Sequence, residues 1–467
     1  MGISAKLKDA SQKRLLDEIL TLAAGGGNKQ TILRAFDLAA YFTPRRQRPK
    51  LAFVRDKIQR DHPAYALAQR VVGDFSPAAR DRFIQCFVIN CLLRGSQVRD
   101  DFSAAHGFAP PFTVLISPTM RCNLACAGCY AAEYPAGRDM SRQTLQRIVD
   151  QGREMGTYWF TLLGGEPFIY PGLLDFCAAN RDCYFLIFSN GTLIDDQAIH
   201  ELAHIGNVAP MLSIEGDREA TDQRRGEGAF EQQMTVMSGL RTAGVPFGYS
   251  ITVTRGNWRT VVGDAFVDGL VDKGAVVGWH FLYMPVGRGA DTSPMLRPGE
   301  RNAFRRGIER IRAAKPIFPV DFWGDAPYIG GCIAAKHYVH ITSEGWVEPC
   351  IFTHFATDNI NEVSLREAFD SPYFNEIRRR QPFNENLLMP CMLIDNPHHS
   401  REIMAVSGAR PTHPGADGYF GEMAGELDEY AAEVERVYAP IWSASHPSGS
   451  KLVAAADGTR GHFAAGP

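Results

Sequence analysis

The sequence predicts an α/β fold, in which a partial (β/α)6 TIM-like barrel follows an all-helical domain and precedes a small α+β extension. Three observations indicate this fold. Residues 1–105 show only helical spacing of apolar residues, residues 112–290 alternate short apolar runs with amphipathic segments of helix length, and beyond Pro316 the runs shorten into hairpin-like pieces. A complete barrel takes about 250 residues, whereas the central block has about 200, which suits six units.

Six apolar runs of the central block are predicted as strands, and the helices between them allow the right-handed crossovers of a parallel sheet. The strands are expected at 113–117, 158–163, 184–189, 208–214, 246–253 and 278–284. The helices are expected near 141–154, 171–179, 195–205, 228–243, 259–273 and 297–314. In the extension we expect a strand, a turn and a strand over 337–352, and then helices at 365–370 and 373–380; beyond the extension we expect an acidic helix at 417–440.

We therefore expect five segments along the chain. They are a basic helical domain (1–105), the barrel (106–315), an auxiliary extension (316–400), a C-terminal helix (401–442) and a disordered tail rich in small and polar residues (443–467). No apolar run reaches the ~18–20 residues of a membrane-spanning helix. The first 20 residues lack the apolar core of a signal peptide, so the expected location is cytoplasmic.

The composition is that of a globular protein, and the charge is unevenly distributed. Hydrophobic residues make up 45% and charged residues 22%, which excludes a wholly disordered, collagenous or coiled-coil chain. Residues 1–100 hold 18 Lys and Arg against 9 Asp and Glu, and the remaining residues hold 31 against 43. A basic head on an acidic body predicts an anionic partner, such as a membrane surface to which the protein would be peripheral. A solvated face, or docking of the head on the body, is the alternative; no nucleic-acid partner is expected.

Ten cysteines in a chain of this kind indicate metal binding rather than disulfides. Cys122, Cys126 and Cys129 follow the first predicted strand in one short loop. Three thiolates on a cubane [4Fe–4S] cluster leave one iron without a protein ligand. A zinc site is the alternative, but zinc ligands usually come in pairs two to four residues apart, which this triplet fits poorly.

With four further motifs, this triplet resembles the radical S-adenosylmethionine (SAM) superfamily. The motifs follow successive strands: Gly164-Gly165-Glu166-Pro167, Ser189-Asn190, Ser213 with Glu215, and Arg224-Arg225 in the next loop. Ligands of a parallel barrel bind at these strand ends. The resemblance implies a [4Fe–4S] cluster that binds SAM. It also implies that a flavodoxin- or ferredoxin-like donor supplies an electron that cleaves SAM to a 5′-deoxyadenosyl radical. That radical would abstract hydrogen from, or add to, a substrate.

The resemblance also implies which residues contact SAM. Glu166 would receive the ammonium group, Arg224 or Arg225 the carboxylate, and the ring of Tyr130 would face the adenine. Gly164 and Gly165 would let the backbone approach the ligand closely. The remaining residues expected at the SAM site are Pro167, Ser189, Asn190, Ser213, Glu215 and Met284, the last within a Tyr283–Gly289 segment similar to SPASM-type relatives.

A second cysteine group lies beyond the barrel at Cys332, Cys350 and Cys391. Its spacing resembles the SPASM or twitch extension of the same superfamily, which implies one auxiliary [4Fe–4S] cluster. Three cysteines leave the fourth ligand unassigned; nearby candidates are His354, Asp395, His398 and His399, and solvent or substrate could also fill the position. A zinc site and plain buried thiols remain alternatives. The other four cysteines are expected to be structural: Cys86, Cys91, Cys177 and Cys183.

The substrate is the least determined feature. A peptide or protein, a small metabolite and a lipid all remain open. The cysteine loop with Tyr134-Pro135 resembles enzymes that adenosylate hopanoid precursors, and the basic head would suit a bilayer. Asp321 and Asp325 are candidate bases and Tyr328 a candidate hydrogen donor, each with a structural role as the alternative. A non-catalytic iron–sulfur electron carrier or scaffold is the competing class, but it would not need the SAM motifs.

Overall fold

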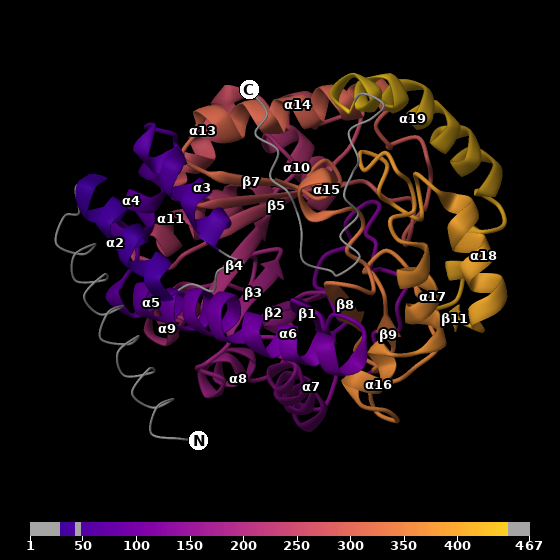
Figure 1. The fold of residues 1–467 in the computed structure, drawn as a ribbon, viewed down its shortest axis with the longest axis horizontal. Helices are drawn as coiled ribbons and strands as arrows, with labels where there is room; N and C mark the ends of the chain where they lie inside the picture. Colours follow the sequence, from indigo (N-terminus) through magenta and orange to yellow (C-terminus); the bar gives the residue numbers. More distant parts are fainter. Residues whose placement is uncertain (1–28, 43–47, 447–467) are drawn as a thin grey trace.

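The computed structural model describes residues 29–42 and 48–446 (Figure 1). The predicted helical domain is confirmed over its described part. Its helices are α2 (Lys29–Phe42), α3 (Arg48–Gln59), α4 (Ala64–Gly73), α5 (Pro77–Arg82), the π-helix η1 (Phe83–Arg94) and α6 (Gly95–His106). The expected tail at 443–467 lies outside the described residues except for its first four, of which three end the last helix.

A nine-stranded sheet forms the centre of the molecule. Its order is β7-β6-β5-β4-β3-β2-β1-β8-β9, and all neighbours are parallel except the last pair. The strands are β1 (Thr113–Thr119), β2 (Trp159–Gly164), β3 (Tyr184–Ser189), β4 (Val208–Ser213), β5 (Gly248–Val253), β6 (Val277–Leu282), β7 (Phe318–Asp321), β8 (Tyr338–Ile341) and β9 (Val347–Glu348). The six predicted strands are thus present, and the extension adds three more to the same sheet.

Helices connect the strands and cover one face of the sheet. They are α7 (Arg142–Glu154), the 3-10 turn η2 (Pro167–Ile169), α8 (Leu173–Ala179), α9 (Asp196–Ile205), α10 (Arg218–Arg225), α11 (Ala229–Thr242), α12 (Trp258–Val261), α13 (Asp264–Lys273) and α14 (Pro298–Ala314). The prediction that Arg224 and Arg225 lie in a loop is wrong. They end α10, a helix without apolar periodicity that begins where the Asp217 side chain accepts the Ala220 N–H.

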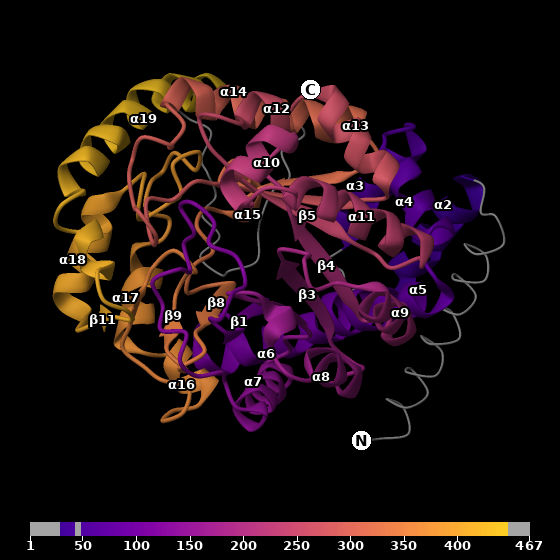
Figure 2. The same cartoon turned by 180° about the vertical axis from the view of Figure 1, so that it is seen from behind.

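The C-terminal segment packs beside β1, β8 and β9, at the other end of the sheet from α2–α5 (Figures 1 and 2). It contains α15 (Ala326–Ile329), α16 (Leu365–Phe369), α17 (Pro372–Arg380), α18 (Pro397–Ser407), η3 (Ala416–Tyr419) and α19 (Ala424–Ser445), with a small antiparallel pair of β10 (Phe355–Ala356) and β11 (Arg410–Pro411). The predicted second hairpin strand, 346–352, is shorter than expected because only Val347–Glu348 pairs.

The two faces of the sheet have different partners. On β3, Phe185 and Ile187 belong to the main core with the outer helices, whereas Tyr184 and Leu186 face η1. Phe87 of η1 packs edge-on against Trp159 of β2, with ring centroids 5.1 Å apart. The N-terminal helices therefore close one end of the inner face, and the carboxyl ends of the strands lie at the other.

The four cysteines expected to be structural are all completely buried. Cys86 and Cys91 lie in η1, and Cys177 and Cys183 lie in the main core. Burial raises the pKa of Cys86 to about 12 and that of Cys91 to about 11, so both remain thiols.

Candidate active site

The loop that follows β1 carries the first three cysteines. Cys122 is exposed, and Cys126 and Cys129 are half-buried. Both ribbon views place this purple loop between the carboxyl ends of the central strands and the orange C-terminal segment (Figure 2). The position agrees with the general location of sites in parallel barrels.

Gly164 and Gly165 hold the start of this loop. A Cβ atom on Gly164 would lie 2.3 Å from the Thr119 carbonyl oxygen, and one on Gly165 would lie 2.2 Å from that of Arg121. The Gly165 N–H donates to Thr119 (3.1 Å) and the Glu166 N–H to Arg121 (2.8 Å). The close approach predicted for these glycines is therefore made by the chain's own cysteine loop.

Glu166 is fully buried and links the ends of two strands. Its Oε1 accepts from Ser189 Oγ (2.8 Å) and the Phe168 N–H (3.1 Å), and its Oε2 accepts from the Asn190 N–H (2.7 Å). Burial raises the pKa of Glu166, although these three donors act in the opposite direction. Its expected role at an ammonium group stays a prediction, because the contacts observed are all within the protein.

Asn190 connects this network to the cysteines. Its Nδ2 donates to Asn123 Oδ1 at 2.9 Å and lies 3.8 Å from Cys122 Sγ. The Leu124 N–H also points to Cys122 Sγ at 3.5 Å. Burial raises the pKa of Cys122, and the Leu124 N–H opposes this rise; the thiolate is the form that binds metal.

Glu215 and both arginines form a buried cluster on the other side of the loop. Glu215 Oε1 accepts from Arg224 Nη1 (2.5 Å) and from Arg225 Nε (2.8 Å) and Nη2 (2.5 Å). Arg224 Nε also donates to the Ala127 carbonyl (3.0 Å), so the cluster binds the cysteine loop directly. Burial raises the pKa of Cys126, and the two arginines oppose this rise. Two guanidinium groups against one carboxylate leave one net positive charge beside the loop.

The segment after β6 covers Cys129, the third cysteine of the first loop. Gly287 has a φ of +82°, and a Cβ there would lie 2.3 Å from the Cys129 carbonyl oxygen, so only glycine fits without a backbone shift. The Arg288 N–H donates to the same oxygen (3.1 Å). Met284, expected at the SAM site, is buried in the main core. The side chain of Tyr130 packs edge-on against Phe352, with centroids 5.7 Å apart.

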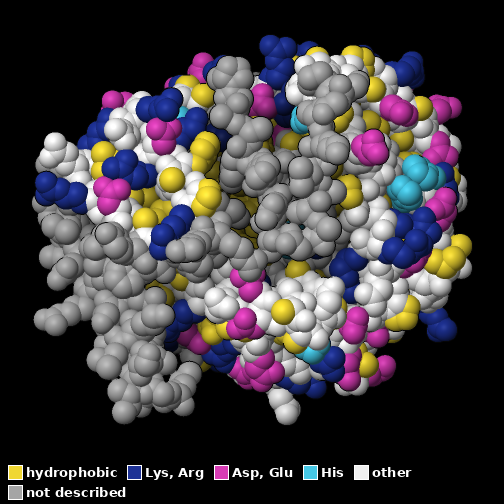
Figure 3. All heavy atoms as spheres, viewed as in Figure 1, with side chains coloured by type: hydrophobic (Ala, Val, Ile, Leu, Met, Phe, Trp, Pro, Cys, Tyr) yellow, Lys and Arg dark blue, Asp and Glu magenta, His cyan; other side chains and the backbone are white. Residues whose placement is uncertain are grey.

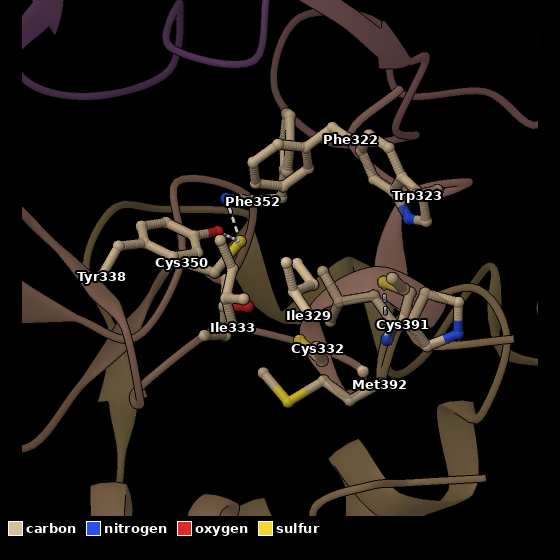
Figure 4. Close-up of a pocket in the computed structure, with 16 residues that line it drawn as sticks. Phe322, Trp323, Ile329, Cys332, Ile333, Tyr338, Cys350, Phe352, Cys391 and Met392 are labelled. Carbon is tan, nitrogen blue, oxygen red and sulfur yellow. Dashed lines mark hydrogen bonds between the residues drawn. The ribbon is translucent and has the colours of Figure 1, made fainter. Parts of the chain in front are cut away.

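The second cysteine group lines one cavity (Figure 4), whose empty volume is ≈ 490 Å³, part of it open to solvent. Cys332, Cys350 and Cys391 come from three separate segments and meet there with aromatic neighbours. Tyr338, for which no motif predicts a role, donates its hydroxyl to Cys350 Sγ at 2.7 Å. Burial raises the pKa of Cys350 to about 11 and that of Cys391 to about 12, so a bound cluster would have to displace their protons.

A single metal ion and a cluster make different demands on these cysteines. Among residues 29–42 and 48–446, no three His, Cys, Asp or Glu side chains stand close enough together to hold one ion. A four-iron cluster is wider than one ion, so its thiolates stand farther apart. Three thiols that meet at one cavity are the kind of donor set that such a cluster takes.

The four candidates for a fourth ligand lie elsewhere. Asp395 is bound by the buried Arg301 (Nη1–Oδ1, 2.5 Å) and accepts the Cys391 N–H at 3.0 Å. His354 is hydrogen-bonded to His413 (2.8 Å) and to the Ile351 carbonyl (3.0 Å). The rings of His398 and His399 contact each other in a tilted arrangement, with centroids 4.3 Å apart. None of the four lines the cavity formed by the described residues.

None of the three residues predicted for catalysis lines the cavity, although neighbouring residues of the same segment do. Asp321 is buried and accepts the N–H groups of Trp323 (3.2 Å) and Gly324 (2.8 Å). Asp325 pairs with Arg312 (2.9 Å), and Tyr328 is 51% exposed. Their segment reaches the cavity through Phe322, Trp323, Ala326 and Ile329 instead. Their catalytic roles stay predictions, since the observed contacts of both aspartates are structural.

Comparison with known proteins identifies two domains. Residues 116–259 match the radical SAM superfamily, and residues 332–392 match SPASM, an iron–sulfur cluster-binding domain. The AdoMet-dependent heme synthase of Oleidesulfovibrio alaskensis is 28% identical over 300 residues, which cover 57% of this chain and 76% of that protein. The PqqA peptide cyclase of Gluconobacter oxydans is 26% identical over 290 residues, covering 58% and 80%.

A solved structure shares the fold. Streptococcus suis SuiB bound to S-adenosylmethionine superposes with a TM-score of 0.53 at 19% identity, covering 64% of this chain and 76% of SuiB. The radical SAM match, together with these enzymatic relatives, identifies the class as that of the radical SAM enzymes. This chain is one that also carries a SPASM domain, and the two domains imply a [4Fe–4S] cluster, SAM and auxiliary iron–sulfur binding.

Proposed function

We propose that the protein reductively cleaves SAM and uses the resulting radical to modify a substrate held between the two cysteine groups. The observation that carries this proposal is the placement of Cys122, Cys126 and Cys129 at the strand ends, directly beside the segment of Cys350. Tyr130 of the first loop touches Phe352 of the second segment. When bound, an iron–sulfur cluster would supply the electron for cleavage of the SAM sulfonium.

The residues around the first loop have defined parts in this proposal. Cys122, Cys126 and Cys129 hold the cluster, and Gly164 and Gly165 fix the entry of the loop. Glu166 keeps an unused acceptor position on Oε2, which can receive the ammonium group of SAM. Arg224 and Arg225 leave one positive charge beside the loop, which favours the SAM carboxylate and the anionic thiolates.

We further propose that the auxiliary cluster is held by only three cysteines. The other seven are placed in the structure: three in the first loop and four buried in the cores. The four polar candidates near Cys350 and Cys391 do not line the cavity. One iron would therefore be open to solvent or to a group of the substrate.

The inner face of the sheet supports a substrate with an apolar, ring-bearing part. Phe188, Trp279 and Phe281 project from β3 and β6 on this face and remain partly exposed. Phe281 continues to Phe322 at the cavity, with centroids 5.1 Å apart. Aromatic walls of this kind bind flat or apolar groups. The names of the relatives include a peptide cyclase and heme synthases. A peptide and a heme-type molecule can each bring an apolar or ring-bearing group to these aromatic side chains.

Metal analysis tests the cofactor assignment. After anaerobic reconstitution the protein should contain about eight irons. Replacing Cys122, Cys126 and Cys129 together by Ala should leave about four, and so should the triple replacement of Cys332, Cys350 and Cys391. Cys177→Ala, which removes a buried core thiol, is the control and should retain the full iron content. Unchanged iron in either triple variant would remove that cluster from the proposal.

Product analysis tests the reaction. SAM with a strong reductant should yield 5′-deoxyadenosine and methionine, and Cys126→Ala should abolish both. Substrates are then sought by mass spectrometry of lipid, peptide and metabolite extracts from producing and deletion strains. Trp279→Leu should lower substrate turnover but not SAM cleavage without substrate, whereas Trp258→Leu, on α12, should change neither. Equal substrate turnover by the wild type and Trp279→Leu would exclude the aromatic wall.

We also propose that the basic N-terminal segment, residues 1–105, binds an anionic membrane surface peripherally. No described helix is long and apolar enough to cross a bilayer. Over α2–α4, Lys and Arg side chains lie among Asp and Glu (Figure 3), and Arg55 pairs with Asp37 at 2.6 Å. Flotation with anionic and neutral vesicles at low and high salt tests peripheral binding. Equal flotation with both vesicle types would remove the membrane surface as a partner.

A further inference from the structure

A buried polar network lies between the two cysteine groups and uses residues with no role so far. Glu348 of β9 is fully buried and is its centre. Its Oε1 accepts from Tyr134 Oη (2.8 Å) and Thr412 Oγ1 (2.5 Å), and its Oε2 from Tyr134 Oη (2.9 Å) and His340 Nδ1 (2.6 Å). His340 Nε2 then meets Ser117 Oγ at 2.7 Å.

The network joins segments that are distant in sequence. Ser117 lies on β1, His340 on β8, and Tyr134 five residues after Cys129 in the first cysteine loop. Glu348 itself lies two residues before Cys350. One carboxylate therefore connects the first cysteine loop, the central sheet and the auxiliary cysteine segment.

Ser117, His340 and Glu348 have the connectivity of a hydrolytic triad, but they cannot act as one. Ser117, His340 and Glu348 are all 0% exposed, so no substrate reaches the hydroxyl. A nucleophilic serine must meet the reacting carbonyl. These three residues can therefore act only on the protein groups around them.

One arrangement of the hydrogens gives every group in the network a partner and leaves the network with a negative charge. If Ser117 donates to His340 Nε2, the neutral imidazole donates from Nδ1 to Glu348, and every proton has an acceptor. Tyr134 and Thr412 also donate to Glu348, which suits the acceptor-only ionised carboxylate. No Lys or Arg is among the hydrogen-bond partners found for these five residues in the described chain.

We propose that Glu348 is a positioning residue that fixes the first cysteine loop against the auxiliary segment and, through its charge, makes both iron–sulfur sites harder to reduce. A buried anion acts strongly because little solvent screens it. It lies between the two sites: Glu348 is two residues before Cys350, and Tyr134, which donates to its carboxylate, is five residues after Cys129. This inference rests on the proposed function, since it requires that both clusters are present.

The test is a redox titration of the reconstituted protein followed by electron paramagnetic resonance. Glu348→Gln removes the charge and should move the midpoint potentials of both clusters upward. Glu344→Gln is the matched control, because it removes a carboxylate from the exposed turn between β8 and β9 and should leave both potentials unchanged. Iron content and thermal stability are measured on the same samples.

A second variant keeps the test decisive if Glu348→Gln loses its clusters. Tyr134→Phe removes a donor but retains the carboxylate, so the local charge is less compensated and both potentials should move downward. A purely structural network would lower stability without these opposite shifts, and unmoved potentials in clustered variants would overturn the proposal. If the wild type itself shows no cluster signals, the proposed function fails, which is a distinguishable result.

Discussion

The strongest test of the site architecture is the substitution Gly165→Ala. The added Cβ would lie 2.2 Å from the Arg121 carbonyl oxygen, 2.6 Å from its carbon and 2.6 Å from the Met120 carbonyl oxygen. Real Cβ atoms essentially never lie closer than 3.0 Å to such atoms, so the entry of the cysteine loop must move by roughly 0.8 Å. Overpacking of this kind costs about 1–3 kcal/mol.

The displaced backbone is adjacent to Cys122, so the variant should lose iron from the first cluster before it unfolds. The assay is iron content after anaerobic reconstitution, with SAM cleavage and a thermal melt on the same samples. Gly269→Ala in α13 is the matched control, because nothing lies within 4 Å of its added Cβ. Alanine should stabilise that helix by up to about 1 kcal/mol. Full iron content and wild-type SAM cleavage in Gly165→Ala would refute the view that this contact positions the loop.

Three further predictions concern buried charges. Glu215→Gln leaves two largely buried arginines without their carboxylate and should cost about 3–5 kcal/mol of unfolding free energy, measured in denaturant melts. The control is Glu231→Gln, which breaks the exposed pair of Glu231 with Arg218 and should cost under about 1 kcal/mol. Asp395→Asn breaks the pair with Arg301 and should cost a similar 3–5 kcal/mol. It should also lower auxiliary iron while the first cluster is kept, and equal loss from both would contradict this. Burial and the nearby Asp325 raise the pKa of Asp321 to about 6, so its protonated form stabilises the fold below about pH 4 and this contribution is lost as the pH rises through about 6. Asp321→Asn should flatten that part of the stability profile, and an unchanged slope would contradict the shift.

The alternation of apolar runs predicted the central strands well because each run is short and flanked by turn residues or helix caps. β7 was missed, since Phe318–Asp321 has only four residues and contains Pro319. The hairpin of β8 and β9 was predicted, but its place beside β1 was not, because that pairing joins residues more than 200 positions apart. α10 was missed because its eight residues are polar nearly all round, so its start depends on a cap rather than on periodicity.

The candidate site was predictable where chemistry dictates spacing. Both cysteine groups were found from sequence, because a cluster requires several thiolates and the spacing of the first triplet is specific. Roles that depend on what a side chain meets in space were not predictable. Glu166 bonds to Ser189, Arg224 bonds to Glu215, and Tyr134 bonds to a glutamate from β9, and none of these contacts leaves a local pattern in the sequence.

The contacts around the first loop explain why its motifs are spread over so much of the chain. The glycines after β2 hold its start, Arg224 binds its middle, and Gly287 with Arg288 covers its end. Asn190, directly after β3, adds a contact to Cys122. Each contact holds a different point of the loop. Loss of one contact should therefore change the iron content of the first cysteine group more than it changes SAM cleavage by the protein that keeps its cluster. The loop is thus positioned by the whole barrel edge, which requires that the strands pair correctly before the three thiolates can converge on a cluster.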